Sequence, residues 1–439
     1  MGRTLAVVAV LCASLWGTTR TSAQEENQAA DSSSAQSVNQ VVQWNKILLG
    51  IVRTPKAQPA TIHPTRSFAI MHAAIYDAVN AIDRTHKPYL VQLSGIPRHA
   101  SQPAAAAAAA HEVLIALYPS FKAMLDTDLQ QSLAEIGPGN DVNEGLRIGQ
   151  LVGDRVVALR SKDGSDATPV NYVFGTAPGD FQSPPPVSPK QPQFTSWSHV
   201  TPFALANAAQ FRPEPPPALS SDVYEDAFNE VKSLGIANST AASADQALTG
   251  RFWNGAIQNY WNEITQTAAI DAELTTAQSA RLFALLNLTF ADSVIAFYDA
   301  KYTYNFWRPV TAIRDASTTD NPNTTPDTTW LPEVVNTTPD PSYPGAHAVI
   351  SAAGETVLIS FFHHDHLRFD VTSEVMSGTV RSFDSFADAA EEATLSRLFA
   401  GVHFRFDLTR GQRLGRQVAD FVVDNFLTVR DEPVEAEDR

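Results

Sequence analysis

Apolar residues recur at steps of three and four along much of the chain, a spacing typical of amphipathic helices. The segment RLFALLNLTFADSVIAFYDAKY places six of them on one face: Leu282, Leu285, Leu286, Phe290, Val294 and Phe297. The segment TRGQRLGRQVADFVVDNF repeats the pattern, and AVISAAGETVLISFF reads as a further helix. Few runs of β-branched residues alternate with a period of two. The sequence therefore predicts an all-α protein.

The predicted helices fall into two groups. Helical patterns run through SFAIMHAAIYDAVNAI, PAAAAAAAHEVLIALY and VNEGLRIGQLVGDRVVALR, and resume at SSDVYEDAFNEVKSLG, where Ser221 suits the N-cap. Between them, residues 161–220 carry two PPP runs and several glycines with little periodicity, which is typical of a long ordered connection. We expect one helical bundle over 41–160, a Pro-rich connection over 161–220 and a second bundle over 221–427.

Both ends of the chain have a composition of their own. Residues 1–23 combine a positive charge at Arg3, the apolar run LAVVAVLCASLW and the small residues TSA, which are the features of a signal peptide. An uncleaved N-terminal anchor is the alternative. We expect a disordered lead-in over 24–40, an acidic tail over 428–439 and a secreted or periplasmic protein.

Composition narrows the class of protein further. The chain has 439 residues, 44% of them hydrophobic, and a formal net charge of -16. It is therefore globular, too long for one ordinary core, and poorly suited to nonspecific nucleic-acid binding. Its single cysteine, Cys12, lies within the predicted signal, so the mature chain would have no disulfide, thiolate metal site or cysteine nucleophile. No later run of 18 apolar residues is apparent, so we expect no membrane span in the mature chain.

Three groups of chemically active side chains follow one another in the second half. In KYTYNFWRP, Lys301 and Arg308 are seven residues apart, which would place them on one helical face, with Pro309 ending that helix. In PSYPGAH, His347 follows a turn at the start of a predicted helix. The third group, LSRLFAGVHFRFD, supplies Arg397, His403 and Asp407. His403 and Asp407 would be adjacent if that stretch is helical.

Together these groups favour a site for a tetrahedral oxyanion. Guanidinium forks, an ammonium group and the N–H groups of a turn are the donors that hold such an anion. An imidazole beside it can act as nucleophile, metal ligand or proton donor. Taken singly, each group is more often ordinary, such as a solvated Lys–Arg pair or a packed histidine. The joint pattern is what points to a site.

This pattern resembles the superfamily of type 2 phosphatidic acid phosphatases and vanadium-dependent haloperoxidases. Its signature is Lys, six residues, Arg-Pro; then Pro-Ser-Gly-His; then Ser-Arg, five residues, His, three residues, Asp. KYTYNFWRP and SRLFAGVHFRFD match the first and third elements without a gap. MHAAIYDAVNAI, PPPALSSDVYEDAFNEVKSLG and FYDAKYTYNFWRPVTAIRD resemble the soluble haloperoxidase branch, so the resemblance covers most of residues 41–427. The integral-membrane lipid phosphatases are a poorer fit.

The resemblance implies a two-bundle, haloperoxidase-like fold and roles for the charged residues. Lys301, Arg308 and Arg397 would bind the equatorial oxygens of vanadate or phosphate. His403 would be the axial partner, which is the metal ligand in a peroxidase and the phosphorylated nucleophile in a phosphatase.

The remaining roles concern the turn and the neighbours of the histidines. By the same resemblance, His347 would be the acid–base group that protonates peroxide or the leaving oxygen. Gly345 and Ala346 would supply backbone N–H donors. Asp407 would orient a basic or imidazole group of the site without contacting the anion itself.

Two departures from the signature bear on the chemistry. Gly345 stands where the family has serine, which removes one hydroxyl donor. Asp340, seven residues before His347, stands where haloperoxidases often carry an aromatic or imidazole group, and its carboxylate should repel halide if it faces the pocket. Asp292 and Asp299 could pair with the site cations, although a helix-surface role suits them equally.

The first expectation is a vanadium-dependent haloperoxidase with vanadate as cofactor and hydrogen peroxide, halide and an organic acceptor as substrates. The alternatives are an acid phosphatase that cleaves a phosphate ester through a phosphohistidine without a cofactor, and a non-catalytic protein that binds an oxyanion. The sequence gives neither the halide nor the organic substrate, and a homodimer stays open.

Overall fold

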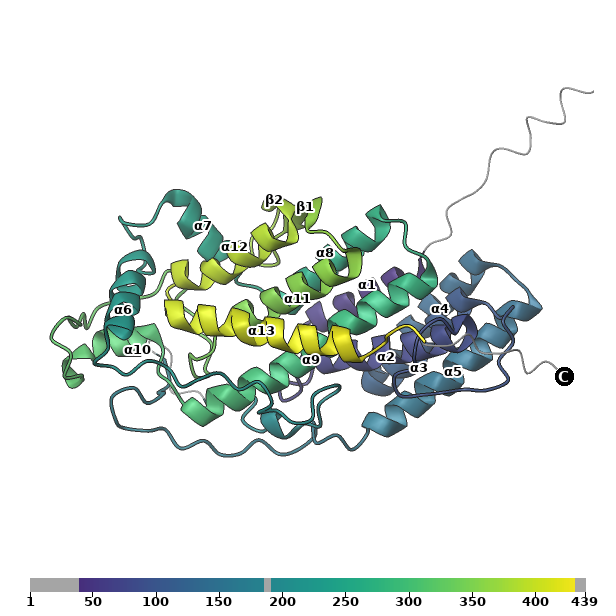
Figure 1. Cartoon of the computed structure of the whole chain (residues 1–439), viewed down its shortest axis with the longest axis horizontal. Coiled ribbons are helices and arrows are strands. Elements are labelled where there is room, and N and C mark those ends of the chain that lie inside the picture. The colour runs from purple at the N-terminus through teal and green to yellow at the C-terminus, as the bar shows by residue number, and fades with distance from the viewer. Residues whose placement is uncertain (1–38, 185–190, 431–439) are drawn as a thin grey trace, which may run out of the picture. The chain divides into compact units, whose positions relative to one another are not determined.

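The computed structural model describes residues 39–184 and 191–430, which belong to one compact unit (Figure 1). The predicted signal peptide, nearly all of the lead-in and most of the tail lie outside the described residues. The last two lead-in residues already belong to a helix start, because Asn39 caps the first helix by accepting from the N–H groups of Val41 and Val42. That helix therefore begins one residue earlier than predicted.

The described residues confirm the all-α class, with thirteen α-helices joined by turns and three short 3₁₀ helices. The helices are α1 Gln40–Arg53, α2 Pro64–Asp83, α3 Gln102–Leu117, α4 Lys122–Ile136, α5 Asn140–Arg160, α6 Asp222–Leu234, α7 Ala244–Phe252, α8 Ile257–Asp271, α9 Thr276–Tyr304, α10 Pro309–Arg314, α11 Ala346–Phe362, α12 Phe386–Phe399 and α13 Arg405–Asn425. One antiparallel hairpin, β1 (His366–Thr372) with β2 (Val380–Ser385), is a feature that the sequence did not predict.

The alanine-rich helix α3 packs closely against α5. Ser101 caps α3 by accepting from the Ala104 N–H, and a proline stands in its first turn. A Cβ atom added at Gly145 of α5 would lie 2.3 Å from the backbone carbonyl oxygen of Ser101, and one added at Gly149 would lie 2.3 Å from that of Ala105. Glycine is therefore required at both positions, because any side chain would separate the two helices.

The long helix α9 runs through the apolar core. It packs against α2 as well as against α11 and α13, so helices from both halves of the chain share one hydrophobic cluster (Figure 1). By length and composition α9 could span a membrane, which corrects the expectation that no such run follows the signal. However, 94% of its most apolar window is buried inside the protein, as in a core helix. The division into two bundles at the predicted bounds stays a prediction.

The predicted connection crosses the surface of these helices, and Asp292 of α9 holds it there by hydrogen bonds. The Asp292 carboxylate accepts from three successive backbone N–H groups, those of residues 203–205, at 2.6–2.7 Å. Asp299 pairs with Arg212 of the same connection at 2.6 Å. Among the described contacts, neither carboxylate reaches the predicted site cations. Both aspartates therefore position the connection and do not neutralise the positive charge of the site.

Candidate oxyanion site

Lys301 and Arg308 lie on different elements, which corrects the expected arrangement. Helix α9 ends at Tyr304, where Asn305 adopts a left-handed conformation with a φ of 49°. Arg308 then caps α10, and Pro309 occupies the first position of that helix and does not end the previous one. The turn between the helices brings both cations to the loop that precedes α11.

The PSYPGAH turn delivers the N-terminus of α11 to the site. Gly345 is the N-cap, and its N–H donates to the Asp407 carbonyl at 3.0 Å, so this donor is already used. A Cβ at Gly345 would lie 3.1 Å from Cδ2 of Leu408, which shows that the position faces α13 closely. Ala346 is the first helical residue and lines the cavity, so its N–H is the turn donor that could serve an anion.

His403 has the protonation state that a metal ligand or nucleophile needs, which is a neutral ring with a lone pair on Nε2. It precedes α13, and its Nδ1 lies 3.1 Å from Oδ2 of Asp407, which also accepts from the Phe404 N–H at 3.0 Å and the Ser342 hydroxyl at 2.5 Å. A carboxylate partner places the proton on Nδ1 and leaves a lone pair on Nε2, 3.0 Å from Nη1 of Arg308. Burial, followed by the charge of Arg308, holds the pKa of His403 well below its usual value, so the ring is neutral at pH 7.

Arg397 offers the clearest unsatisfied donors. It stands near the end of α12, and its Nη2 donates to Oδ1 of Asn254 at 3.2 Å. Its Nε and Nη1 are buried and have no hydrogen-bond partner among the described residues. Burial, with the charge of Arg308, lowers the pKa of Arg397 to about 9. Unpaired donors on a buried cation are costly, and a bound oxyanion would satisfy them.

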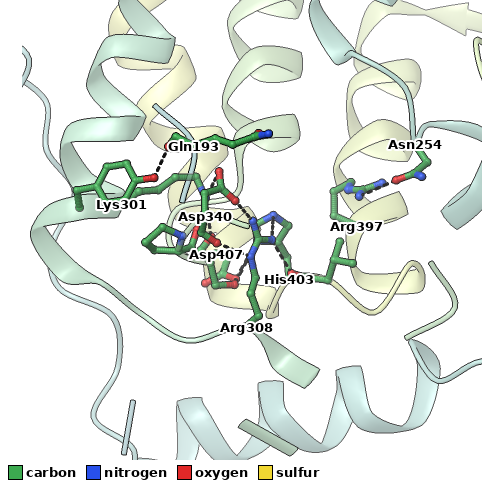
Figure 2. Close-up of polar contacts among 12 residues, drawn as sticks. Gln193, Asn254, Lys301, Arg308, Asp340, Arg397, His403 and Asp407 are labelled. Carbon is green, nitrogen blue, oxygen red and sulfur yellow. Dashed lines mark hydrogen bonds and ion pairs between the residues drawn. The ribbon is translucent and has the colours of Figure 1, made fainter. Parts of the chain in front are cut away.

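Asp340 already engages the other two cations. Its carboxylate accepts a hydrogen bond from Nη2 of Arg308 and lies 3.7 Å from Nζ of Lys301, while its carbonyl accepts from Nε of Arg308 at 2.9 Å. The Lys301 ammonium donates to the carbonyls of residues 341–342. Burial lowers the pKa of Lys301, and the Asp340 charge opposes that shift. Figure 2 shows Arg308 between Asp340 and His403, and Arg397 turned toward Asn254.

His347 lies in the first turn of α11. Its Nε2 is 2.9 Å from the carbonyl oxygen of Trp253, which can only accept, so the proton is on Nε2 and the ring acceptor is Nδ1. Burial, with the charge of Arg397, lowers the pKa of His347 well below its usual value. The ring is therefore neutral and can first accept a proton, which the imidazolium form could not do.

A cavity of about 320 Å³ joins these groups. Its polar part is lined by Arg308, Asp340, Ala346, His347, Arg397 and His403, and its apolar part by Ile257, Val294, Phe297, Tyr298, Ile350 and Phe194, with His63 beside Phe194. The structure thus brings five of the predicted site residues to the lining of one cavity, with Asp340 beside them. Lys301 lies behind the wall, fully buried.

Known proteins with related sequences share this arrangement of helices. Residues 281–432 match the family described as the VCPO second helical-bundle domain. The chain is 25% identical to the vanadium chloroperoxidase of Curvularia inaequalis, over 84% of this chain and 79% of that protein. It matches the crystal structure of a bacterial vanadium-dependent iodoperoxidase with a TM-score of 0.74 and 26% identity, covering 90% of this chain and 97% of the other. The chain is therefore similar to vanadium haloperoxidases over most of its length, and the family match itself is confined to residues 281–432.

A more distant structure agrees in fold. A bacterial vanadium-dependent chloroperoxidase, in its holo form, aligns with a TM-score of 0.62 at 15% identity over 92% of this chain and 96% of the other. This likeness supports the haloperoxidase-like helical architecture of the chain.

Vanadate fits the residues present. Among the described residues, no group of three or more His, Cys, Asp or Glu side chains converges as a metal cation would require. An oxyanion cofactor needs one axial nitrogen and surrounding cationic donors. The Nε2 lone pair of His403 and the two unpaired donors of Arg397 supply both kinds of contact.

Sequence reasoning missed several members of this haloperoxidase-like site. Ser342 supports Asp407, and its place within PSYPGAH was an available signal. Asn254 contacts Arg397, while His63 and Phe194 form part of the cavity wall. These three come from segments far from the motifs, and nothing in the sequence marks them.

Proposed function

We propose that the protein is a secreted vanadium-dependent haloperoxidase that uses hydrogen peroxide to oxidise a halide. The observation that carries this proposal is the neutral, buried His403, whose Nδ1 is hydrogen-bonded to Asp407 and whose Nε2 lies 3.0 Å from Nη1 of Arg308. Haloperoxidase relatives over most of the chain support an enzyme of the oxidoreductase class. The signal-like first 23 residues support export.

The residues divide the work as follows. His403 would ligate vanadate through Nε2, and Arg397, Arg308 and Lys301 would neutralise its oxygens. When bound, vanadate supplies Lewis-acid activation of hydrogen peroxide toward attack by halide. Nδ1 of His347 would accept the first proton released by peroxide and later return it to the departing oxygen.

The apolar part of the cavity, described above, would exclude water from the reacting groups. Such exclusion strengthens the attraction between the arginines and a bound anion, because the local dielectric constant falls. It also offers an apolar surface beside the site at which an organic acceptor could meet the oxidised halogen.

Phosphatase activity is the second candidate, and Asp340 is the observation that favours it. A carboxylate on the cavity wall opposes the approach of halide, whereas phosphate-ester cleavage needs no halide. The same His403 Nε2 could attack phosphorus, because a site built for trigonal-bipyramidal vanadate resembles a phosphoryl-transfer transition state.

Two assays on purified protein separate these functions. Protein loaded with orthovanadate should halogenate an indicator when given hydrogen peroxide and iodide, bromide or chloride, and His403→Ala should abolish that activity. The exposed His364 provides the matched control, since His364→Ala should leave the rate unchanged.

The opposite pattern would favour the second candidate. Vanadate-free protein that hydrolyses an aryl phosphate, with inhibition by orthovanadate and no halogenation, would replace the peroxidase proposal. Inactivity in both assays with vanadate bound would leave a non-catalytic oxyanion-binding protein.

A further inference from the structure

Asp340 contacts two of the three cations of the candidate oxyanion site. It belongs to the loop before α11, lines the cavity and is only 4% exposed. One carboxylate oxygen accepts from Nη2 of Arg308, and the other lies 3.7 Å from Nζ of Lys301. The side chain therefore occupies donors that the proposed site needs for its cofactor.

The donors of Arg308 show what an oxyanion would have to displace. Its Nε donates to the Asp340 carbonyl, and its Nη1 lies near both the Val402 carbonyl oxygen, at 2.9 Å, and Nε2 of His403, at 3.0 Å. Nη2 is held by the Asp340 carboxylate. Among the three oxygen partners, that carboxylate can leave by side-chain rotation alone, because the two carbonyl groups are fixed in the backbone.

The cations do not depend on the carboxylate for their position. The Asp340 carbonyl holds Nε of Arg308 whether or not the side chain is charged. Lys301 is held by the carbonyl groups of residues 341–342. Neutralising the Asp340 side chain should therefore weaken its hold on Nη2 of Arg308 and leave both cations in place.

Charge makes the competition strong. Three positive charges are buried here, on Lys301, Arg308 and Arg397. The carboxylates of Asp340 and Asp407 can offset two of these charges. Asp407 contacts the Nδ1 side of His403, away from Nε2, whereas Asp340 lines the cavity itself. A second anion close to Asp340 in a buried setting is repelled.

We propose that Asp340 is a built-in competitor of the oxyanion, which holds Arg308 and Lys301 in the unliganded protein and must turn away when vanadate or phosphate binds. The residue thus sets the affinity of the site and keeps it lower than the three cations alone would give. This inference rests on the oxyanion site of the proposed function, but it does not depend on peroxidase chemistry.

The test is the dissociation constant for orthovanadate and, separately, for inorganic phosphate, measured by isothermal titration calorimetry on the full-length protein. Asp340→Asn keeps the shape and removes the charge, so it should tighten binding of both anions by roughly 10- to 100-fold. Asp340→Glu retains a carboxylate and should bind both anions as weakly as the wild type does. Asp384→Asn removes a carboxylate whose side chain is 80% exposed and should change neither constant.

The outcomes are distinguishable from failure of the proposed function. If Asp340→Asn is folded and binds the two anions no more tightly than the wild type does, the proposed competition is wrong, although the oxyanion site itself is still supported. Absence of binding in both proteins would remove the competition and the site together. Thermal unfolding of each variant shows whether it is folded.

Discussion

At the scale of single residues, His403 owes its chemistry to Asp407. One oxygen of that carboxylate, Oδ2, accepts from the Ser342 hydroxyl, the Phe404 N–H and Nδ1 of His403. This arrangement fixes the tautomer, directs Nε2 toward Arg308 and makes the imidazole more basic toward an electrophile. The four-residue step from His403 to Asp407 predicted this contact on the condition that the stretch is helical; the contact forms although His403 lies before the start of α13.

Replacing Asp407 should therefore weaken the site without removing a ligand. In Asp407→Ala, the proton of His403 loses its fixed partner, and the dissociation constant for orthovanadate should rise by about 10- to 100-fold. Ser342→Ala removes one of the donors to the carboxylate and should have a smaller effect. Equal affinity in Asp407→Ala and wild type, measured by equilibrium dialysis, would show that the carboxylate does not prepare the imidazole.

Asp340 shows the limit of residue-level prediction. The sequence identified it as a departure from the family pattern, and the repulsion of halide was conditional on its facing the pocket. The structure places it on the cavity wall and in contact with Arg308. That pairing could not be predicted, because it depends on the turn between α9 and α10.

At the scale of elements, the helices of the core were predictable and their junctions were not. The three- and four-residue periodicity gave α9 and α13, and the Ser221 cap gave the start of α6. The break after Tyr304 went unseen, because Asn305 in a left-handed conformation carries only a weak local signal. The hairpin between α11 and α12 was also missed, because only two residues of each strand are buried, so the alternation of apolar and polar positions is weak.

The packing of α13 against α11 positions both histidines. A Cβ at Gly415 would lie 2.1 Å from the Val349 carbonyl oxygen, so Gly415→Ala must push the two helices apart. We expect the free energy of unfolding to fall by about 1–3 kcal/mol. Binding of orthovanadate should weaken as well, because α11 begins beside His347 and α13 beside His403.

Gly50 of α1 offers the matched control. An added Cβ there meets nothing within 4 Å, so Gly50→Ala should raise the free energy of unfolding by about 0.5–1 kcal/mol through helix propensity. Urea denaturation of both variants checks the pair. A Gly415→Ala protein as stable as wild type would contradict the close packing.

At the scale of the whole molecule, one site collects residues from segments more than 300 positions apart in the chain, from His63 to His403. The motifs of the second half could be predicted from the sequence, because each keeps the spacing of the family. The cavity wall could not, because it depends on how the first half and the connection lie over α9. The Asp292 contacts with the connection contribute to that placement.

The central claim is that His403 and Arg397 hold an oxyanion cofactor. The most direct measurement is a crystal structure of the protein soaked with orthovanadate, with the vanadium located by anomalous scattering. We predict vanadium at bonding distance from Nε2 of His403, with its oxygens hydrogen-bonded to Nε and Nη1 of Arg397 and with Asp340 turned off Arg308. Vanadium at another place, or crystals that bind none while Nε of Arg397 stays unpaired, would contradict the claim.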